Sequence, residues 1–247
     1  MLSFFHEYLY TPIYNLLVFL VGVVPGGDVG VAVITATVIV KVVLMPLSFA
    51  ALKTQKAMKV MEPELRKIRE DLKDNREEQA RALFALYKKY DVKPLASLLT
   101  MLIQIPILIA LYFVFVNEAL PNVDETLLYS FVAIPPTISP LFLGIFAVTG
   151  SSLVLAVLTA LTQFVQASVM ITVPPKKKGE EPTMQEEFGR AMALQARYAL
   201  PVIMGIVAYT SGAVALYFIT SNLIGVAQEL LARRITFTPP PSPAEDA

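Results

Sequence analysis

The sequence predicts an all-α, polytopic membrane protein with five transmembrane helices and a basic helical hairpin on the cytoplasmic side. Hydrophobic residues make up 55% of the 247 residues and charged residues only 16%, whereas soluble domains carry about a quarter charged residues. Several uncharged runs reach the roughly 20 residues that a helix needs to cross the hydrocarbon core. The basic residues are gathered in a few segments, and this pattern predicts the orientation of the chain.

Long uncharged runs define the predicted spans. The first run is interrupted only by Lys41, and the last contains 31 residues, which is too long for one span. The sequence Thr-Ser-Gly at 210–212, near the middle of the last run, is typical of a tight turn. We therefore predict two short spans there. The predicted spans are 29–52, 95–116, 151–173 and the two halves of 198–228.

Lys and Arg indicate which segments face the cytoplasm, because they are retained on that side of short loops. Residues 53–94 hold twelve of the twenty basic residues. The loop after the third span and the C-terminal tail hold all the others except Lys41, whereas residues 1–28 and 117–150 contain none. We therefore expect a multi-pass protein of the bacterial cytoplasmic membrane with its N-terminus outside and its C-terminus inside.

The chain divides into five segments on this reading. Residues 1–28 lie at the outer face, where residues 3–24 form either a sixth span or, as we expect from their short apolar run, an interfacial helix. The others are the first transmembrane helix (29–52), the cytoplasmic hairpin (53–94), the remaining four-helix part of the core (95–235) and a disordered, Pro-rich cytoplasmic tail (236–247).

Two amphipathic stripes predict the hairpin. Residues that are mostly apolar recur at helical spacing before and after Asp74-Asn75, which we expect to form the turn. Pro63 suits the first turn of a helix, because that position needs no backbone N–H. The stripes are Met61, Leu65, Ile68 and Leu72 in the first helix, and Gln79, Leu83, Leu86 and Tyr90 in the second.

Lys41 lies near the middle of the first predicted span. It is 12 residues from Val29 and 12 from Lys53, which is about 18 Å of helix and beyond the reach of a lysine side chain. A charge at this depth costs on the order of 3 kcal/mol, and such residues usually face a bundle interior, a partner charge or water. The predicted spans contain no Asp or Glu, and Glu229 lies at the end of the last one. We expect a hydrated cavity; the alternative is a structural lysine satisfied by carbonyl groups.

Polar residues share a helix face in each of four predicted spans. Thr37 and Ser48 lie on the face of Lys41. Such residues often only join helices, but four polar faces around one charge favour a shared polar groove. The others are Ser97, Thr100 and Gln104; Thr159, Thr162, Gln163 and Gln166; and Tyr217, Ser221 and Gln228.

Several motifs resemble the YidC/Oxa family of membrane protein insertases. Residues 93–112 read KPLASLLTMLIQIPILIALY, which resembles the family's NPL…LIQMPI…ALY segment. Residues 40–47 read VKVVLMPL and resemble the first core span, where a basic residue, usually Arg, precedes a Pro-Leu pair by five positions. The resemblance also includes residues 198–203 and 211–222, and it covers nearly all of 29–235.

The resemblance implies a five-helix core around a hydrophilic groove, which opens to the cytoplasm and the lipid and is closed toward the outside. It also implies that the basic hairpin receives the substrate. Lys41 stands where Arg is usual, so carboxylate groups would meet a point charge rather than a bidentate guanidinium. The candidate groove residues are Lys41, Thr37, Thr100, Gln104, Gln166, Tyr217 and Ser221.

We expect the protein to insert and help fold nascent membrane proteins, and not to be an enzyme. The chain has no Cys and one His, so no catalytic or metal site is predicted, and it has no nucleotide-binding motif or other sign of a cofactor. The expected partners are nascent membrane proteins and the lipid bilayer, with a Sec-type translocon and the ribosome as further candidates and no specific nucleic acid. The alternative is a small transporter or channel, which would more naturally show carboxylates in its spans or an inverted repeat.

The absence of cysteine makes the predicted topology directly testable. Single cysteines introduced at Asn75, Gly179 and Ser242 should be shielded from a membrane-impermeant thiol reagent in intact cells, whereas one at Asn122 should react. The reagent cannot cross the bilayer, so only outward-facing positions are labelled. Labelling at Ser242 without labelling at Asn122 would contradict the orientation.

Overall fold

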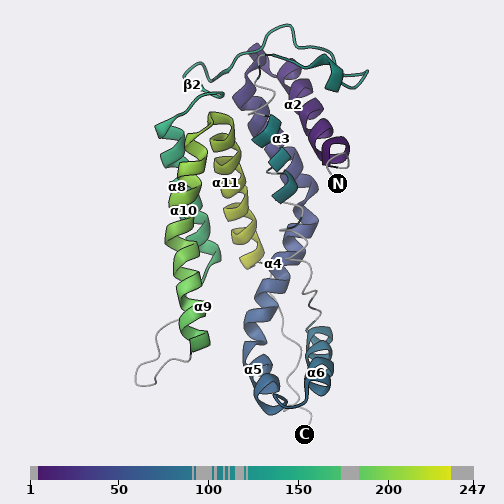
Figure 1. Cartoon of the computed structure of the whole chain (residues 1–247), viewed down its shortest axis with the longest axis vertical. Helices are drawn as coiled ribbons and strands as arrows, with labels where there is room; N and C mark the ends of the chain where they lie inside the picture. The colour runs from purple at the N-terminus through teal and green to yellow at the C-terminus, as the bar shows by residue number, and fades with distance from the viewer. Residues whose placement is uncertain are drawn as a thin grey trace. The chain divides into compact units, whose positions relative to one another are not determined.

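The computed structural model describes residues 5–90, 92, 102, 105–107, 109–110, 112–114, 120, 122–173 and 184–234. It is mostly helical, as predicted (Figure 1). The chain packs into two compact units. The first contains residues 1–43 and 105–227, and the second contains residues 44–104 and 228–247.

The first unit begins with two helices that pack against each other. A π-helical turn, η1 (His6–Tyr10), leads without a break into α2 (Thr11–Val23), and Pro12 lies in the first turn of α2. The turn η2 (Pro25–Gly27) then leads into α3 (Val29–Val43). Their contact is apolar and fully buried, with Tyr14, Leu17 and Val18 on α2 and Val29, Ala32 and Val33 on α3.

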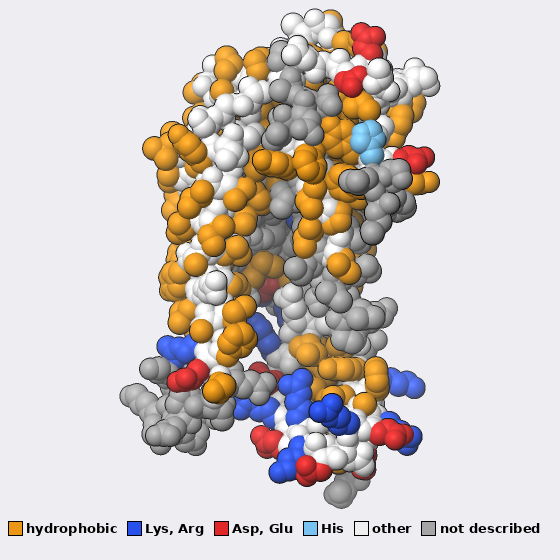
Figure 2. Space-filling model, in the orientation of Figure 1, with side chains coloured by type: hydrophobic (Ala, Val, Ile, Leu, Met, Phe, Trp, Pro, Cys, Tyr) orange, Lys and Arg blue, Asp and Glu red, His pale blue; other side chains and the backbone are white. Residues whose placement is uncertain are grey.

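Three longer helical segments also belong to this unit, the last of them as far as residue 227. They are α8 (Leu153–Met170), a continuous helix made of α9 (Met184–Leu194), η4 (Gln195–Ala199) and α10 (Leu200–Tyr209), and α11 (Gly212–Arg234). α8 and α10 lie side by side (Figure 1). They approach closely at Gly205, where an added Cβ would lie 3.1 Å from the Cβ of Ala160. Their outward side chains are hydrophobic (Figure 2), including Leu161 and Ile206, which are more than half exposed.

The lengths of the observed helices can be compared with those of the predicted membrane spans. Among the described residues, three helices, Leu153–Met170, Glu187–Tyr209 and Gly212–Arg234, are long and apolar enough to cross a membrane, and the broken pair α3 and α4 would make a fourth. The predicted break at 210–212 is confirmed, because α10 ends at Tyr209 and α11 begins at Gly212. The fourth span is longer than the uncharged run suggested, because the helix continues back through Arg197.

The first predicted span, 29–52, is not one unbroken helix in the structure. α3 ends at Val43, Leu44 separates the helices, and α4 (Met45–Val60) continues past position 52 into the segment that we assigned to the hairpin. Pro46 is the physical reason, because it lacks an N–H for the helical hydrogen bond and its ring clashes with the carbonyl four residues earlier. Ser48 therefore does not continue the helical face of Lys41.

A long loop connects to α8 and is bonded to three helices of the first unit. It contains the turn η3 (Glu125–Leu127) and a two-stranded antiparallel ribbon, β1 (Leu141–Phe142) and β2 (Phe146–Ala147), a small exception to the all-α prediction. Tyr129 N–H donates to Asn15 on α2, and Leu143 N–H donates to Asp28 before α3. The first two N–H groups of α11 donate to Gly150 and Val148.

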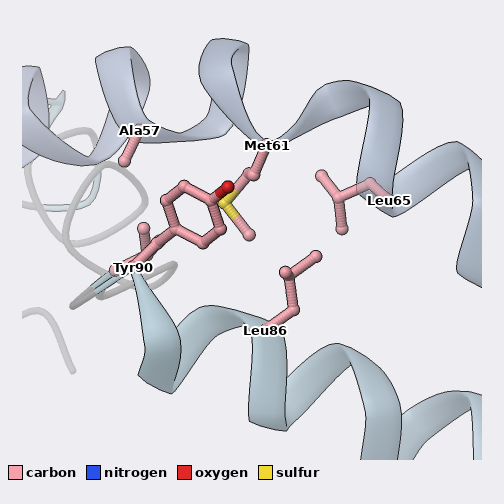
Figure 3. Packing of buried hydrophobic residues seen from close by; sticks show 6 residues of the cluster. Ala57, Met61, Leu65, Leu86 and Tyr90 are labelled. Atoms are coloured by element: carbon pink, nitrogen blue, oxygen red, sulfur yellow. The ribbon is translucent and has the colours of Figure 1, made fainter. Parts of the chain in front are cut away.

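The second unit contains the helical hairpin of α5 (Glu62–Asp71) and α6 (Arg76–Lys89). The apolar stripes face each other, and the residues that Figure 3 labels point inward from the two sides. Pro63 lies in the first turn of α5, as predicted. The buried cluster consists of Ala57, Met61, Leu65, Leu86, Tyr90 and Val92.

A polar clamp joins the two ends of the hairpin. The Tyr90 hydroxyl donates to Glu64 Oε1 at 2.5 Å, and Lys89 Nζ lies 3.1 Å from Glu64 Oε2. These contacts lower the pKa of the Glu64 carboxyl, with the Tyr90 hydrogen bond the largest cause, and the same bond raises the pKa of Tyr90. At the turn, Asn75 caps α6 by accepting from Glu78 N–H.

The clamp should make the hairpin sensitive to acid. A carboxyl group with a lowered folded pKa stabilises the fold above its unfolded pKa, and this contribution is lost as the pH falls through the folded value. Protection of α5 and α6 against hydrogen exchange, corrected for intrinsic rates, should therefore decline below about pH 4.5, the ordinary value for Glu. Tyr90→Phe should cost about 0.5–1 kcal/mol of protection at neutral pH, because Glu64 is partly screened by water.

The control for the clamp is Arg81→Gln, which breaks the exposed pair between Arg81 and Glu77. It should change protection little, because exposed ion pairs contribute little to stability. Equal protection in wild type and Tyr90→Phe across the whole pH range would contradict the clamp.

Candidate functional site

The described groove candidates, Thr37, Lys41, Gln166, Tyr217 and Ser221, all belong to the first unit, on α3, α8 and α11. The structure brings Thr37 and Tyr217 together at one small crevice, whose accessible volume is only about 10 Å³. Both residues are buried, with 3% and 4% of their surfaces exposed. The other lining residues are Ile13 and Leu16 on α2, Ala36 and Val40 on α3, and Ile107.

Lys41 lies four residues after Thr37 on the same helix. This spacing places both on one face of α3, about one turn apart. Lys41 is half-buried and stands two residues before the end of α3 at Val43. The break at Leu44 therefore follows the lysine directly, whereas the sequence suggested that it lay in the middle of a straight helix.

Tyr217 and Ser221 share a face of α11 with Gly225, because the three positions are four residues apart. Ser221 is buried. Gln166 on α8 lies directly against Gly225, since a Cβ added there would be 2.2 Å from its Nε2 atom. One face of α11 therefore runs from the crevice at Tyr217, past Ser221, to the amide of Gln166.

Polar contacts between α8 and α11 accompany this face. Asn222 Nδ2 donates to Thr162 Oγ1 at 3.2 Å, and the hydroxyl of Thr159 lies 3.4 Å from the carbonyl oxygen of Ala215. Asn222 and Gly225 were not among our candidates. Gly225 could have been noticed from its spacing to Tyr217 and Ser221, whereas nothing in the sequence indicated that Asn222 pairs with Thr162.

Several hydroxyl groups are satisfied within their own helices. Thr37 Oγ1 donates to the carbonyl of Val33 at 2.7 Å, and Thr159 Oγ1 donates to that of Leu155 at 2.9 Å. These bonds leave lone pairs on each hydroxyl that can accept a further hydrogen bond. The side chains can therefore line a polar path without leaving an unsatisfied donor in an apolar setting.

Thr100, Gln104 and Gln228 are not among the described residues of the first unit. Thr100 and Gln104, with Ser97 of the same stripe, lie outside the described residues. Gln228 belongs to the second unit. Within the described part of the chain, no three His, Asp or Glu residues are close enough to hold a metal ion.

A sequence model of the family described as "60Kd inner membrane protein" matches residues 20–238, most of the chain and all the groove candidates. The chain belongs to this family, the YidC/Oxa1 family. The match covers the three helices that carry the described candidates. It also covers the α5–α6 hairpin.

Three members of the family are similar to this chain over most of their own length. A "membrane protein insertase YidC" from Clostridium tetani is 28% identical over 212 residues, which cover 85% of this chain and 84% of that protein. The protein with the same description from Fusobacterium nucleatum is 28% identical over 226 residues, covering 90% and 96%. The one from Oceanobacillus iheyensis is 29% identical over 210 residues, covering 83% and 74%.

The contact between Gln166 and Gly225 makes a prediction about stability. Replacing a glycine by alanine inside a helix normally gains about 1 kcal/mol. Gly225→Ala should not stabilise the protein, because the new methyl group must displace the Gln166 amide. In a Gln166→Ala background the same change should stabilise it by about 1 kcal/mol. The free energy of unfolding in mixed micelles, measured for the four combinations, gives the coupling. Equal effects of Gly225→Ala in both backgrounds would contradict the contact.

Proposed function

We propose that this protein is a membrane protein insertase, which inserts nascent membrane proteins into the bilayer and helps them fold. Membership of the family supports this proposal, together with the description of its relatives as membrane protein insertases. The apolar helices α8, α10 and α11 support a location in the membrane. The observation that carries the mechanism is the buried polar face of α11, which meets Thr37 of α3 at one point and Gln166 of α8 at another.

The proposed path for the substrate is a hydrophilic groove inside a core of five transmembrane helices. Lys41, Thr37, Gln166, Tyr217 and Ser221 would line it, with Thr100 and Gln104 on the second span. A polar segment of the substrate would enter the groove from the cytoplasm, so that it crosses a shorter distance of hydrocarbon. The energy would come from partitioning of the substrate's apolar helix into lipid, which stabilises it by about 0.8 kcal/mol for each buried CH₂ group.

Lys41 would attract acidic residues in the translocated segment. Lys41 lies near the end of α3, one turn from Thr37, and this supports a positive charge beside the proposed groove. Charges interact more strongly in a low-dielectric setting than in water and are less screened by salt. The lysine would therefore lengthen the time that an acidic segment spends in the groove.

The orientation that we propose is N-out and C-in in the bacterial cytoplasmic membrane. It places the α5–α6 hairpin, with its many basic residues, on the side where nascent chains arrive. Residues 1–28 would lie at the outer face and residues 236–247 would form a cytoplasmic tail. A Sec-type translocon and the ribosome are further proposed partners at the cytoplasmic side.

Substitution of Lys41 tests the electrostatic part of the proposal. Lys41→Arg should be nearly neutral, because a longer cation still attracts carboxylates. Lys41→Leu should fold, because it removes an insertion cost of about 3 kcal/mol, but it should slow insertion of an acidic substrate about tenfold, which corresponds to about 1.4 kcal/mol. Lys41→Glu should be worse, because attraction becomes repulsion.

The measurement is insertion of a single-span substrate with an acidic amino-terminal segment into vesicles that carry each variant. A substrate with the acidic residues neutralised is the matched control, and its insertion should change little. If all variants insert both substrates equally well, the charge has no role in insertion. If Lys41→Leu unfolds the protein, the lysine is structural.

A further inference from the structure

The long loop before α8 has a composition that is unusual for a loop in water. From Thr126 to Gly150 it contains no charged residue, and it is rich in Leu, Ile, Phe and Val. Several of its large apolar side chains face away from the protein. The exposed fractions are 77% for Phe131, 49% for Ile134, 41% for Leu141, 64% for Leu143 and 72% for Ile145. A group of exposed apolar residues of this size indicates a surface that contacts something other than water.

The exposure is fixed by hydrogen bonds to the helices. The carboxylate of Asp28 accepts from Leu143 N–H at 2.7 Å while it also accepts from Val31 N–H in the first turn of α3. Ser139 N–H donates to the carbonyl of Gly27, and the Ser139 carbonyl accepts from Val29 N–H. The tip of the β1–β2 ribbon is thereby tied to the start of α3 with its side chains directed outward.

The backbone conformation at the tip of the β1–β2 ribbon also indicates a surface that contacts something other than water. Leu143 has a φ of +52°, and the described residues include no other non-glycine residue with a positive φ. A leucine in this left-handed region is strained by contact of its Cβ with the backbone. Glycine would relieve the strain, yet the chain has a large apolar side chain there and exposes it.

The loop also continues directly into an apolar helix surface. Ser152 caps α8 by accepting from Leu155 N–H, and Leu153 and Val154 in the first turn are 68% and 54% exposed. α8 is one of the helices that can cross a membrane. The exposed loop residues therefore lie next to the end of a lipid-facing helix. Tyr129, whose ring lies 5.4 Å from that of Phe131, adds a residue type that is enriched at membrane interfaces.

We propose that residues 126–150 bind the lipid surface at the end of the membrane where α8 begins, with Phe131, Leu143 and Ile145 inserted at the boundary between headgroups and acyl chains. Lipid fits better than a soluble protein partner, because the loop offers no charge for a specific ion pair and is continuous with the lipid-facing helix. The bonds through Asp28 would transmit this anchoring to α3. The inference does not depend on which side of the membrane this end faces, so it is independent of the proposed orientation and of insertase activity.

The protein has no tryptophan, so a single tryptophan reports on one site without background. Ile145→Trp and Phe131→Trp would be prepared in vesicles of phosphatidylglycerol and phosphatidylethanolamine. Asn122→Trp is the matched control, because Asn122 is exposed on the same loop but two residues from Asp124. Leu143 is left unchanged because of its backbone conformation.

Both test variants should show blue-shifted emission compared with Asn122→Trp. Lipids brominated near the headgroup should quench them more than lipids brominated near the end of the acyl chain, and aqueous acrylamide should quench them several-fold less than the control. Emission like that of Asn122→Trp, with strong acrylamide quenching, would overturn the proposal. Protection from both acrylamide and brominated lipid would also overturn it, because the tryptophan would then be covered by protein.

Discussion

The packing of α8 against α11 is the interaction on which the candidate site depends. It is made by polar groups at helical spacing, with Thr159 near Ala215, Thr162 bonded to Asn222 and Gln166 against Gly225. In lipid there is no water to satisfy such groups at the helix surface, so each has to face another helix or an aqueous path. The same helix turns Tyr217 toward α3, and this contact completes the site from the other side.

The two ends of α11 are held by different kinds of contact. At the start of α11, backbone bonds to Val148 and Gly150 hold the long loop over the helix end, and a Cβ on Gly212 would lie 2.2 Å from the Ala147 carbonyl oxygen. At the level of Gly225, contact is made by a flexible amide side chain. We expect the first end to be rigid and the second to accommodate a guest, which fits the proposed entry of substrate from the cytoplasmic side.

Much of the fold follows from local sequence rules. The turn at 210–212 and the hairpin stripes could be predicted because glycine and helical periodicity act over a few residues. The break at Leu44 was predictable from Pro46 but was outweighed by the long apolar run around it. The start of the fourth span could not be fixed from the sequence, because the uncharged run 198–209 is short and a helix can continue through an arginine at a membrane boundary, as it does here at Arg197.

The candidate site could be predicted only in part, because local sequence rules do not show which helices contact each other. Faces of single helices follow from spacing, so Thr37 with Lys41 and Tyr217 with Ser221 were recognised as pairs. Which faces meet depends on contacts between residues far apart in the chain, such as Asn222 with Thr162 or Asp28 with Leu143. These contacts have no signal in one sequence. The need for a glycine at position 225 can be recognised only once Gln166 is known to lie against it.

The central claim is that the polar face of α11 receives the translocated segment of a substrate. The direct measurement is disulfide crosslinking between a single cysteine in that segment of a ribosome-stalled nascent chain and single cysteines introduced into this cysteine-free protein. Ser221→Cys and Gln166→Cys should crosslink to the polar segment, whereas Val157→Cys, at an exposed position on α8, should not. Crosslinking from Val157→Cys alone, with none from the other two, would contradict the account.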